Sequence, residues 1–199
     1  MQIVPFPHPA LRRQSVDVAR IDDTLRAIVR SMFDLMYEAR GIGLAANQVG
    51  LPIRLFVINP SGEKDNPEEE LVFINPVIQK RKGQVVGEEG CLSLPGLYGD
   101  VVRSKEIVVE AFDLDGQGFR VKLDDLPARV VQHEADHLDG VLFIDRVDDL
   151  TRAELNAKLN EMTSAYRQEQ SAGRFPGDEE LARELDRMAS GGMLAAPTA

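Results

Sequence analysis

Two of the three histidines in this chain lie four residues apart, in the run His133-Glu134-Ala135-Asp136-His137. On a helix, side chains at this spacing differ by about 40° in direction, so both imidazoles can bind one metal ion. Glu134 lies at the edge of the same face, where a carboxylate can exchange a proton with a water on that metal. Two ordinary helix histidines with solvated acidic neighbours are the alternative, and the scarcity of histidine favours the metal site.

Such a site needs a third protein ligand if one position is to stay open for water. Glu154 and Glu161 belong to a predicted amphipathic helix and are expected at its surface, and His8, between two prolines, is expected to be exposed to solvent. Cys91 is the ligand that we favour, because the glycine before it and the proline after it indicate a special backbone rather than a core strand. For a lone cysteine, a small buried hydrophobic residue is the alternative. A thiolate with two imidazoles suits Zn²⁺, Co²⁺, Ni²⁺ or Fe²⁺.

A third feature is the run Gly41-Ile-Gly-Leu-Ala-Ala-Asn-Gln48. The end of a helix followed by a tightly packed connection explains its glycines and alanines. It does not explain Gln48, whose amide can donate a hydrogen bond to an oxyanion beside a metal.

The elements that must position these residues follow from periodicity and from capping residues. A helix is predicted from Asp22 or Asp23 to Arg40, with Gly41 as its stop, and a second from Asp124 or Asp125 to about Leu138. Short strands are predicted at 54–58 and 71–74, a hairpin at 106–123, helices at 151–168 and 178–188, and a frayed tail at 190–199. The fold class is therefore α+β, with antiparallel strands around a central metal-binding helix and a C-terminal helical extension.

Composition excludes several classes of protein. A single cysteine cannot form an intramolecular disulfide, and no apolar run approaches the roughly 20 residues of a membrane helix. The N-terminus lacks the pattern of a targeting peptide, so a cytoplasmic protein is expected. The formal net charge of −10 disfavours DNA or another nucleic acid as the main partner.

Together, three blocks resemble the peptide deformylase family. Its patterns Gly-x-Gly-Leu-Ala-Ala-x-Gln, Glu-Gly-Cys-Leu-Ser and His-Glu-x-x-His occur here in that order, at 41–48, 89–93 and 133–137, without a substitution. The resemblance covers roughly residues 1–168, which predicts a catalytic domain over 1–168 and a C-terminal extension over 169–199.

The resemblance implies a metal held by Cys91, His133 and His137, with water as the fourth ligand. Fe²⁺ is the expected cofactor, with Ni²⁺, Co²⁺ or Zn²⁺ as alternatives. The implied reaction is hydrolysis of the N-formyl group from the initiator methionine of new polypeptides, which releases formate. The implied partners are N-formylmethionyl peptides and nascent chains.

It also implies roles for individual residues. Glu134 would accept the proton of the attacking water and later deliver it to the departing amine. Besides the metal, the Gln48 amide and the backbone N–H of Leu92 would hold the developing oxyanion. The substrate main chain would pair with strand-like backbone near Gly43 and Gly90.

The methionine side chain would enter an apolar pocket, for which Ile42, Leu126 and Val130 are candidates. Arg129 lies on the same helix, and we exclude it from this pocket because it is charged. The resemblance further pairs Asp136 with Arg103, whereas a solvated helix aspartate is the alternative.

Two departures from the family limit what the resemblance implies. Tyr98 occupies a place where some members carry an arginine near the substrate entrance, so the preference for residues after methionine is left open. Some bacterial members have a basic C-terminal helix that docks on the ribosome, which makes a transient ribosome contact an implied partner. Here the tail from Asp178 is acidic, a poor match for ribosomal RNA.

Two other functions remain as alternatives. A peptidase or other amidohydrolase could use the same metal and glutamate, but a two-histidine protease should supply a downstream ligand. A non-enzyme could use the metal for folding, but structural sites more often fill all four positions with protein ligands.

Overall fold

The structure is a computed structural model that describes residues 1–192 and consists of helices and antiparallel strands. The helices are α1 Asp23–Glu38, α2 Asp125–Leu138, α3 Asp149–Ser171 and α4 Asp178–Arg187. The strands are β1 Gly43–Ala45, β2 Leu55–Ile58, β3 Leu71–Lys82, β4 Val85–Cys91, β5 Leu94–Arg103, β6 Glu106–Phe112 and β7 Gly118–Asp124. Short helical turns are η1 Pro9–Arg12, η2 Ala46–Val49, η3 Pro67–Glu69, η4 Phe143–Asp145 and η5 Met188–Gly192. The predicted α+β class is confirmed. The predicted frayed tail, 190–199, lies outside the described residues from 193 onward.

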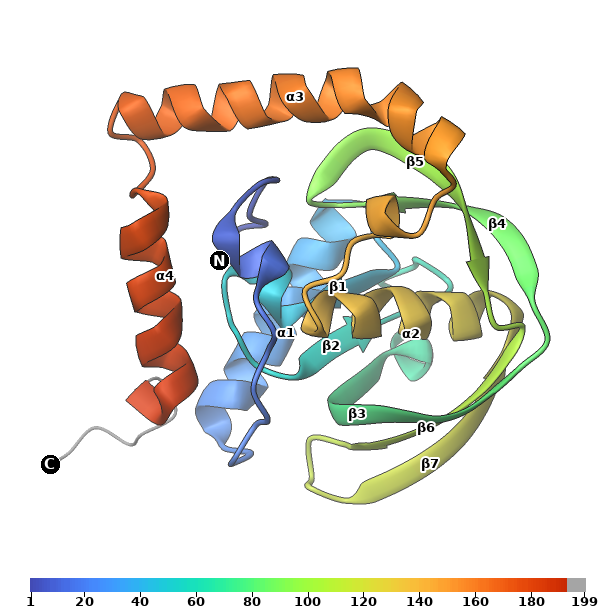
Figure 1. The fold of residues 1–199 in the computed structure, drawn as a ribbon. Helices are drawn as coiled ribbons and strands as arrows, with labels where there is room; N and C mark the ends of the chain where they lie inside the picture. The colour runs from blue at the N-terminus through green and yellow to red at the C-terminus, as the bar shows by residue number, and fades with distance from the viewer. Residues whose placement is uncertain (193–199) are drawn as a thin grey trace, which may run out of the picture.

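The strands form a five-stranded antiparallel sheet, in the order β1-β2-β3-β6-β7, and a separate two-stranded ribbon, β4–β5. In Figure 1, α2 lies in the middle of the molecule, with β3, β6 and β7 below it and the ribbon curving around it. This arrangement encloses the predicted metal-binding helix between a sheet and a ribbon.

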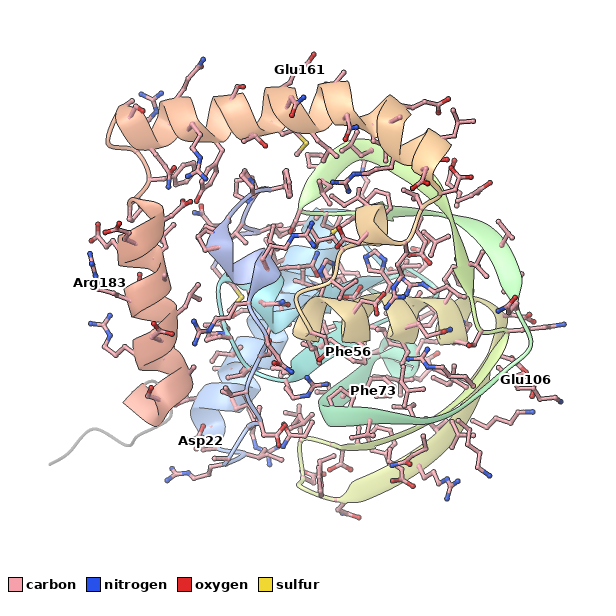
Figure 2. All side chains as sticks on the ribbon, in the orientation of Figure 1. Asp22, Phe56, Phe73, Glu106, Glu161 and Arg183 are labelled. Carbon is pink, nitrogen blue, oxygen red and sulfur yellow. The ribbon has the colours of Figure 1, made fainter. Side chains whose placement is uncertain are left out.

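Strand β2 shows how the core is divided between two helices. Successive side chains of a strand point to opposite faces, and all four of these are buried. Leu55 and Val57 pack with the apolar face of α1, whereas Phe56 and Ile58 belong to the cluster that includes α2. Because both faces are covered, this strand has a continuous apolar run rather than an alternating one. In Figure 2, Phe56 and Phe73 lie close to α2 in the interior.

The first helix begins as predicted but ends for a different reason. The Asp22 side chain accepts a hydrogen bond from the Leu25 N–H, which caps the N-terminus. At the other end, Arg40 rather than Gly41 adopts the left-handed backbone, with φ of 57°. The prediction of Gly41 as the conformational stop is therefore wrong. A Cβ at Gly41 would lie 2.7 Å from Leu92 Cδ1, so the small residue permits a close approach to the turn after Cys91.

The hairpin and β2 agree with prediction, but two other strand regions do not. The strand predicted at 71–74 continues to Lys82 through an irregularity at Asn75-Pro76, where Asn75 has φ of 52°. The ribbon was not predicted, because its glycines and charged residues obscure the alternation of a strand.

The C-terminal helices fold back onto the N-terminal segment. Figure 1 shows α3 running along the top of the molecule and α4 descending on the left, beside the N-terminus. The apolar side chains of Leu181 and Leu185 are buried, and α4 contacts η1. Glu161 on α3 and Arg183 on α4 point away from the body in Figure 2. Among the described residues, no helix is long and apolar enough to cross a membrane.

His8 is half-buried, so the prediction of an exposed histidine is wrong. Its Nδ1 caps η1 by accepting a hydrogen bond from the Ala10 N–H at 3.1 Å, and its ring lies edge-on to Tyr166. Packing against the α3 tyrosine, which periodicity could not reveal, accounts for the difference.

Candidate metal and active site

The predicted ligands come together from two distant parts of the chain. Cys91 ends β4, whereas His133 and His137 project from successive turns of α2. One ligand atom from each lies within 4.8 Å of the other two, and Cys91 Sγ is 3.4 Å from His137 Nε2. Within residues 1–192 this is the group of His, Cys, Asp or Glu side chains whose geometry suits one metal ion. The donor set of one thiolate and two imidazoles therefore fits such an ion.

The other candidates for the third ligand lie elsewhere. Glu154 and Glu161 are exposed on α3, as predicted, and Glu161 pairs with Lys158. His8 lies in the N-terminal segment beside α3. None of the three belongs to the ligand group.

Glu134 is buried beside the histidines, and its surroundings change its acidity. Burial, the largest influence, raises the pKa of its carboxyl to about 7. Its Oε2 atom is buried and has no hydrogen-bond partner among the described residues. A carboxyl with a pKa near neutrality can both accept and return a proton, so its environment suits a general base.

Gln48 is held in one orientation by the backbone. Its Oε1 accepts a hydrogen bond from the Ala45 N–H at 2.8 Å, which turns Nε2 toward Cys91 Sγ at 3.4 Å. The amide is buried and lines the same cleft as Cys91. The N–H end of the amide therefore points into the site, where it can donate to a negative oxygen.

The buried residue that sequence reasoning missed is Glu89. One of its oxygens lies 2.9 Å from His133 Nδ1, and Arg103 donates to the carboxylate at 2.9 and 2.8 Å. Burial opposes ionisation of Glu89, but the hydrogen bonds from Arg103 and His133 outweigh it and hold the pKa well below its usual value. The carboxylate fixes the ring of His133 so that Nε2 is free for a metal.

The predicted contact between Asp136 and Arg103 is confirmed, and it is part of a larger network. Arg103 donates to Asp136 and so links β5 to α2. Arg146, which follows η4, donates to the same carboxylate. Sequence spacing contained no indication of Arg146, because it meets Asp136 only after the chain turns at the end of α2.

His133 would bind a metal in competition with a proton. Burial lowers its pKa, but hydrogen bonds with Cys91 and Glu89 outweigh burial and raise the pKa to about 10. Since an imidazole nitrogen must be deprotonated to bind a cation, metal binding is expected to release this proton.

An open cleft of about 730 Å³ lies over this group. Every predicted substrate-binding residue lines it, together with Gln48, Cys91, Leu92, His133 and Glu134, whereas His137 is buried behind it. The substrate-binding set comprises Ile42, Gly43, Gly90, Leu126 and Val130. Leu126 is 47 % exposed, which places it at the mouth of the cleft.

Two unpaired strand edges border the cleft. Gly43 belongs to β1, the edge strand of the five-stranded sheet, and Gly90 belongs to β4, which pairs only with β5. A Cβ at Gly43 would lie 2.9 Å from Val130 Cγ1, and one at Gly90 would lie 2.7 Å from the ring of Tyr98. Both glycines are thus required by close neighbours, and an extended peptide can add to the edges beside them.

Arg129 also lines the cleft, whereas its exclusion from the methionine pocket on grounds of charge stays a prediction. Its guanidinium donates to Glu89 at 2.7 Å and to ribbon carbonyls, including Val85 O at 3.0 Å. These partners satisfy the charge and allow the residue to form part of the wall.

The site combines one cysteine and two helix histidines with a buried glutamate, and the cleft above it is bordered by unpaired strand edges. This arrangement is typical of a metal-dependent hydrolase that acts on peptide-like substrates. The polypeptide deformylase family model matches residues 1–153. The chain belongs to the peptide deformylase family, whose activity is the deformylation of N-formylmethionine.

Known proteins resemble the chain over most of its length. A peptide deformylase from Rhodopirellula baltica is 45 % identical over 195 residues, covering 96 % of both chains. A crystal structure of the Plasmodium falciparum peptide deformylase has a TM-score of 0.82 and 41 % identity, covering 84 % of this chain and 98 % of that one. A crystal structure of the G41M mutant of Arabidopsis thaliana peptide deformylase 1B has the same TM-score and 42 % identity, covering 87 % of this chain and 93 % of that one.

Proposed function

We propose that the chain removes the N-formyl group from nascent polypeptides with the residue roles assigned above. The observation that carries this proposal is the buried Glu134 carboxyl, with a pKa of about 7, beside the group formed by Cys91, His133 and His137. When bound, a divalent metal supplies Lewis-acid chemistry, which polarises a carbonyl and lowers the pKa of water.

The chain's own residues account for the proton transfers. Glu134 accepts a proton at its carboxylate from the attacking water and then delivers it to the nitrogen of the departing amine. One of its oxygens is buried and has no hydrogen-bond partner among the described residues, so one group can take up the proton and return it. The Gln48 amide and the Leu92 N–H donate hydrogen bonds to the oxyanion that forms on the formyl group.

Substrate binding uses the two strand edges. The peptide main chain adds between β1 at Gly43 and β4 at Gly90, and the methionine side chain occupies the apolar part of the cleft near Ile42, Leu126 and Val130. Main-chain pairing is independent of side-chain identity, which suits an enzyme that acts on many different nascent chains.

Fe²⁺ is our proposed resident metal, because the family resemblance implies it, and a donor set of one thiolate and two imidazoles suits Fe²⁺ as well as Ni²⁺, Co²⁺ or Zn²⁺. A thiolate beside Fe²⁺ is prone to oxidation, which supports a location in the reducing cytoplasm. Metal analysis of protein purified without oxygen tests this assignment: iron is expected, and zinc alone would contradict it.

We also propose that residues 1–168 form the catalytic domain and 169–199 an extension. The family match ends at residue 153, and α4 lies wholly beyond it. Any transient ribosome contact is expected to use a surface other than α4, whose charged side chains include Glu179, Glu180, Glu184 and Asp186 against Arg183 and Arg187. Ribosome co-sedimentation of the full chain and of a chain ending at residue 171 should therefore give the same bound fraction.

The activity is tested with formyl-Met-Ala-Ser and acetyl-Met-Ala-Ser, using protein loaded with Fe²⁺ or Ni²⁺ in the absence of oxygen. Formate and free amine are expected from the formyl peptide only. Cleavage of internal peptide bonds would indicate the peptidase alternative, and no turnover by metal-replete protein would contradict the proposal.

The residue roles are tested separately. Glu134→Ala should retain the metal and lose activity, whereas Cys91→Ala should lose the metal. If Glu134→Ala is fully active, the proposed general base is wrong.

A further inference from the structure

Arg129 connects the helix that carries the histidines to the ribbon that carries the cysteine. It lies on α2, one turn before His133, and its guanidinium reaches across to β4 and β5. It donates hydrogen bonds to Val85 O at 3.0 Å, Gly87 O at 3.2 Å and Val101 O at 3.0 Å. The guanidinium has a planar fork of donors, which suits several acceptors at once.

The ribbon has a glycine where the guanidinium contacts it. A Cβ at Gly87 would lie 3.0 Å from Arg129 Cζ and 3.2 Å from Nε. A side chain at this position would therefore push the guanidinium away from the strand. The contact depends on both residues, and either can be altered to disturb it.

Arg129 also holds the carboxylate that orients His133. It donates to Glu89 Oε1 at 2.7 Å, while the other oxygen of Glu89 lies 2.9 Å from His133 Nδ1. Its side chain is 13 % exposed and that of Glu89 is 4 % exposed, so solvent screens this pair little. Arg129 thus contacts the ribbon backbone and also holds Glu89, which lies two residues before Cys91 and is the partner of His133.

We propose that Arg129 is a positioning residue that keeps Cys91, on the ribbon, correctly placed relative to His133 and His137, on α2. This inference rests on the proposed ligands Cys91, His133 and His137. Arg103 links the same two elements in the opposite direction, from β5 to Asp136 of α2. The two arginines together hold the ribbon against the helix, and Arg129 does so at the wall of the cleft.

The first test is Arg129→Met in the full chain loaded with Ni²⁺, with metal release to a chelator as the readout. Loss of a group that orients a ligand typically costs 10–100-fold in metal affinity. We therefore expect release about 10-fold faster than in the unaltered chain. The release rate of Arg129→Lys should lie between those of Arg129→Met and the unaltered chain. An ammonium can pair with Glu89 but cannot reproduce the planar fork of donors. Unchanged release from folded Arg129→Met would overturn the proposal.

The second test is a double-mutant cycle with Gly87→Ala, which displaces the guanidinium without removing it. Gly87→Ala should speed metal release in the unaltered chain and add little in the Arg129→Met background. Additive effects would show that the two residues act separately and would contradict the proposal. If Arg129→Met does not fold, unchanged release in both Gly87→Ala and Arg129→Lys would contradict it equally.

A matched control is Arg26→Met, which removes a helix arginine that pairs with Asp115 far from the site. Its Ni²⁺ release should equal that of the unaltered chain. Failure of the metal set itself has a different signature: the unaltered chain would bind no Ni²⁺, or Cys91→Ala would retain it. Either result would remove the basis of this inference, whatever Arg129→Met does.

Discussion

Two charged regions of the molecule contain the same residue types but differ in their surroundings. Around the metal ligands, the Arg103 and Glu89 side chains are each 4 % exposed, and they form part of a continuous network. On the C-terminal arm, which we define as α3 and α4, Arg183 and Glu179 are 73 % and 95 % exposed and 4.0 Å apart. Exposed ion pairs contribute about 0–1 kcal/mol, whereas breaking a buried pair leaves an uncompensated charge.

Ion pairs therefore have different roles in the two regions. In the centre, buried charges join the ribbon to α2, and one of them, Glu89, contacts His133. The arm is held against the rest of the molecule by apolar contacts such as those of Leu181 and Leu185. Most of its charged groups are solvated. These surroundings lead to four predictions, in order of decreasing expected effect.

The largest effect is expected from Arg103→Met, which removes the buried arginine that bridges Glu89 and Asp136 and leaves each carboxylate with one arginine, Arg129 and Arg146 respectively. Removing one member of a buried pair typically costs about 3–5 kcal/mol in free energy of unfolding. Urea unfolding in the presence of a chelator measures the loss without a contribution from bound metal. On the arm, Arg167→Met breaks the pair with Asp178 and should cost less than about 1 kcal/mol. Equal losses would refute the comparison.

Gln48→Ala should affect the reaction more than it affects stability. Loss of one oxyanion donor typically lowers kcat by 10²–10³, or about 2.7–4 kcal/mol of transition-state stabilisation. Steady-state kinetics with formyl-Met-Ala-Ser measure kcat. Gln132→Ala is the matched control, because Gln132 is also buried but bonds to Ser104 outside the cleft. A similar fall in kcat for both variants would contradict the role of Gln48.

In the arm, Leu185→Ala should lower the free energy of unfolding by about 2 kcal/mol, the lower end of the range for buried leucines. Its metal release and kcat should not change, because α4 contacts η1 rather than the site. Asp186→Asn, which breaks the exposed pair with Arg13, is expected to cost less than about 1 kcal/mol. Faster metal release in Leu185→Ala would show that the arm supports the centre.

The smallest effect concerns the pH dependence of stability near His8. Burial lowers the pKa of His8 below 6.5, although Asp178 and Glu184 oppose this. The unfolded chain then binds more protons, so this contribution to stability is complete above pH 6.5 and is lost as pH falls below it. His8→Asn keeps a capping acceptor that does not titrate. Urea unfolding at pH 5 and pH 7.5 should show a smaller loss on acidification in the variant; an equal loss would contradict the assignment.

The elements predicted from the sequence are those with local patterns. The helix at Asp23–Glu38 has an apolar face at helical spacing and a capping aspartate, and the hairpin has Asp115-Gly116 at its turn. Both patterns depend on residues within one or two turns of each other. They are visible in the sequence because nearby residues determine the conformation.

The ribbon could not be predicted in the same way. Three of its glycines lie against side chains: Gly87 against Arg129 of α2, Gly99 against Val147 after η4, and Gly90 against Tyr98 of the paired strand β5. In the sequence these glycines resemble the residues of a loop. Their purpose is visible only once the side chains that occupy the space above them are known.

By itself, the sequence determined the family of this protein and predicted the residues of its site. The sequence alone indicates the family and predicts a metal site, through the spacing of His133 and His137 on one helix, the single cysteine and the Gln48 block. Only the tertiary structure decided which side chains surround Cys91, His133 and His137. Glu89, Arg103, Arg129 and Arg146 come from separate segments, and their charges become effective because burial removes the water that would otherwise screen them.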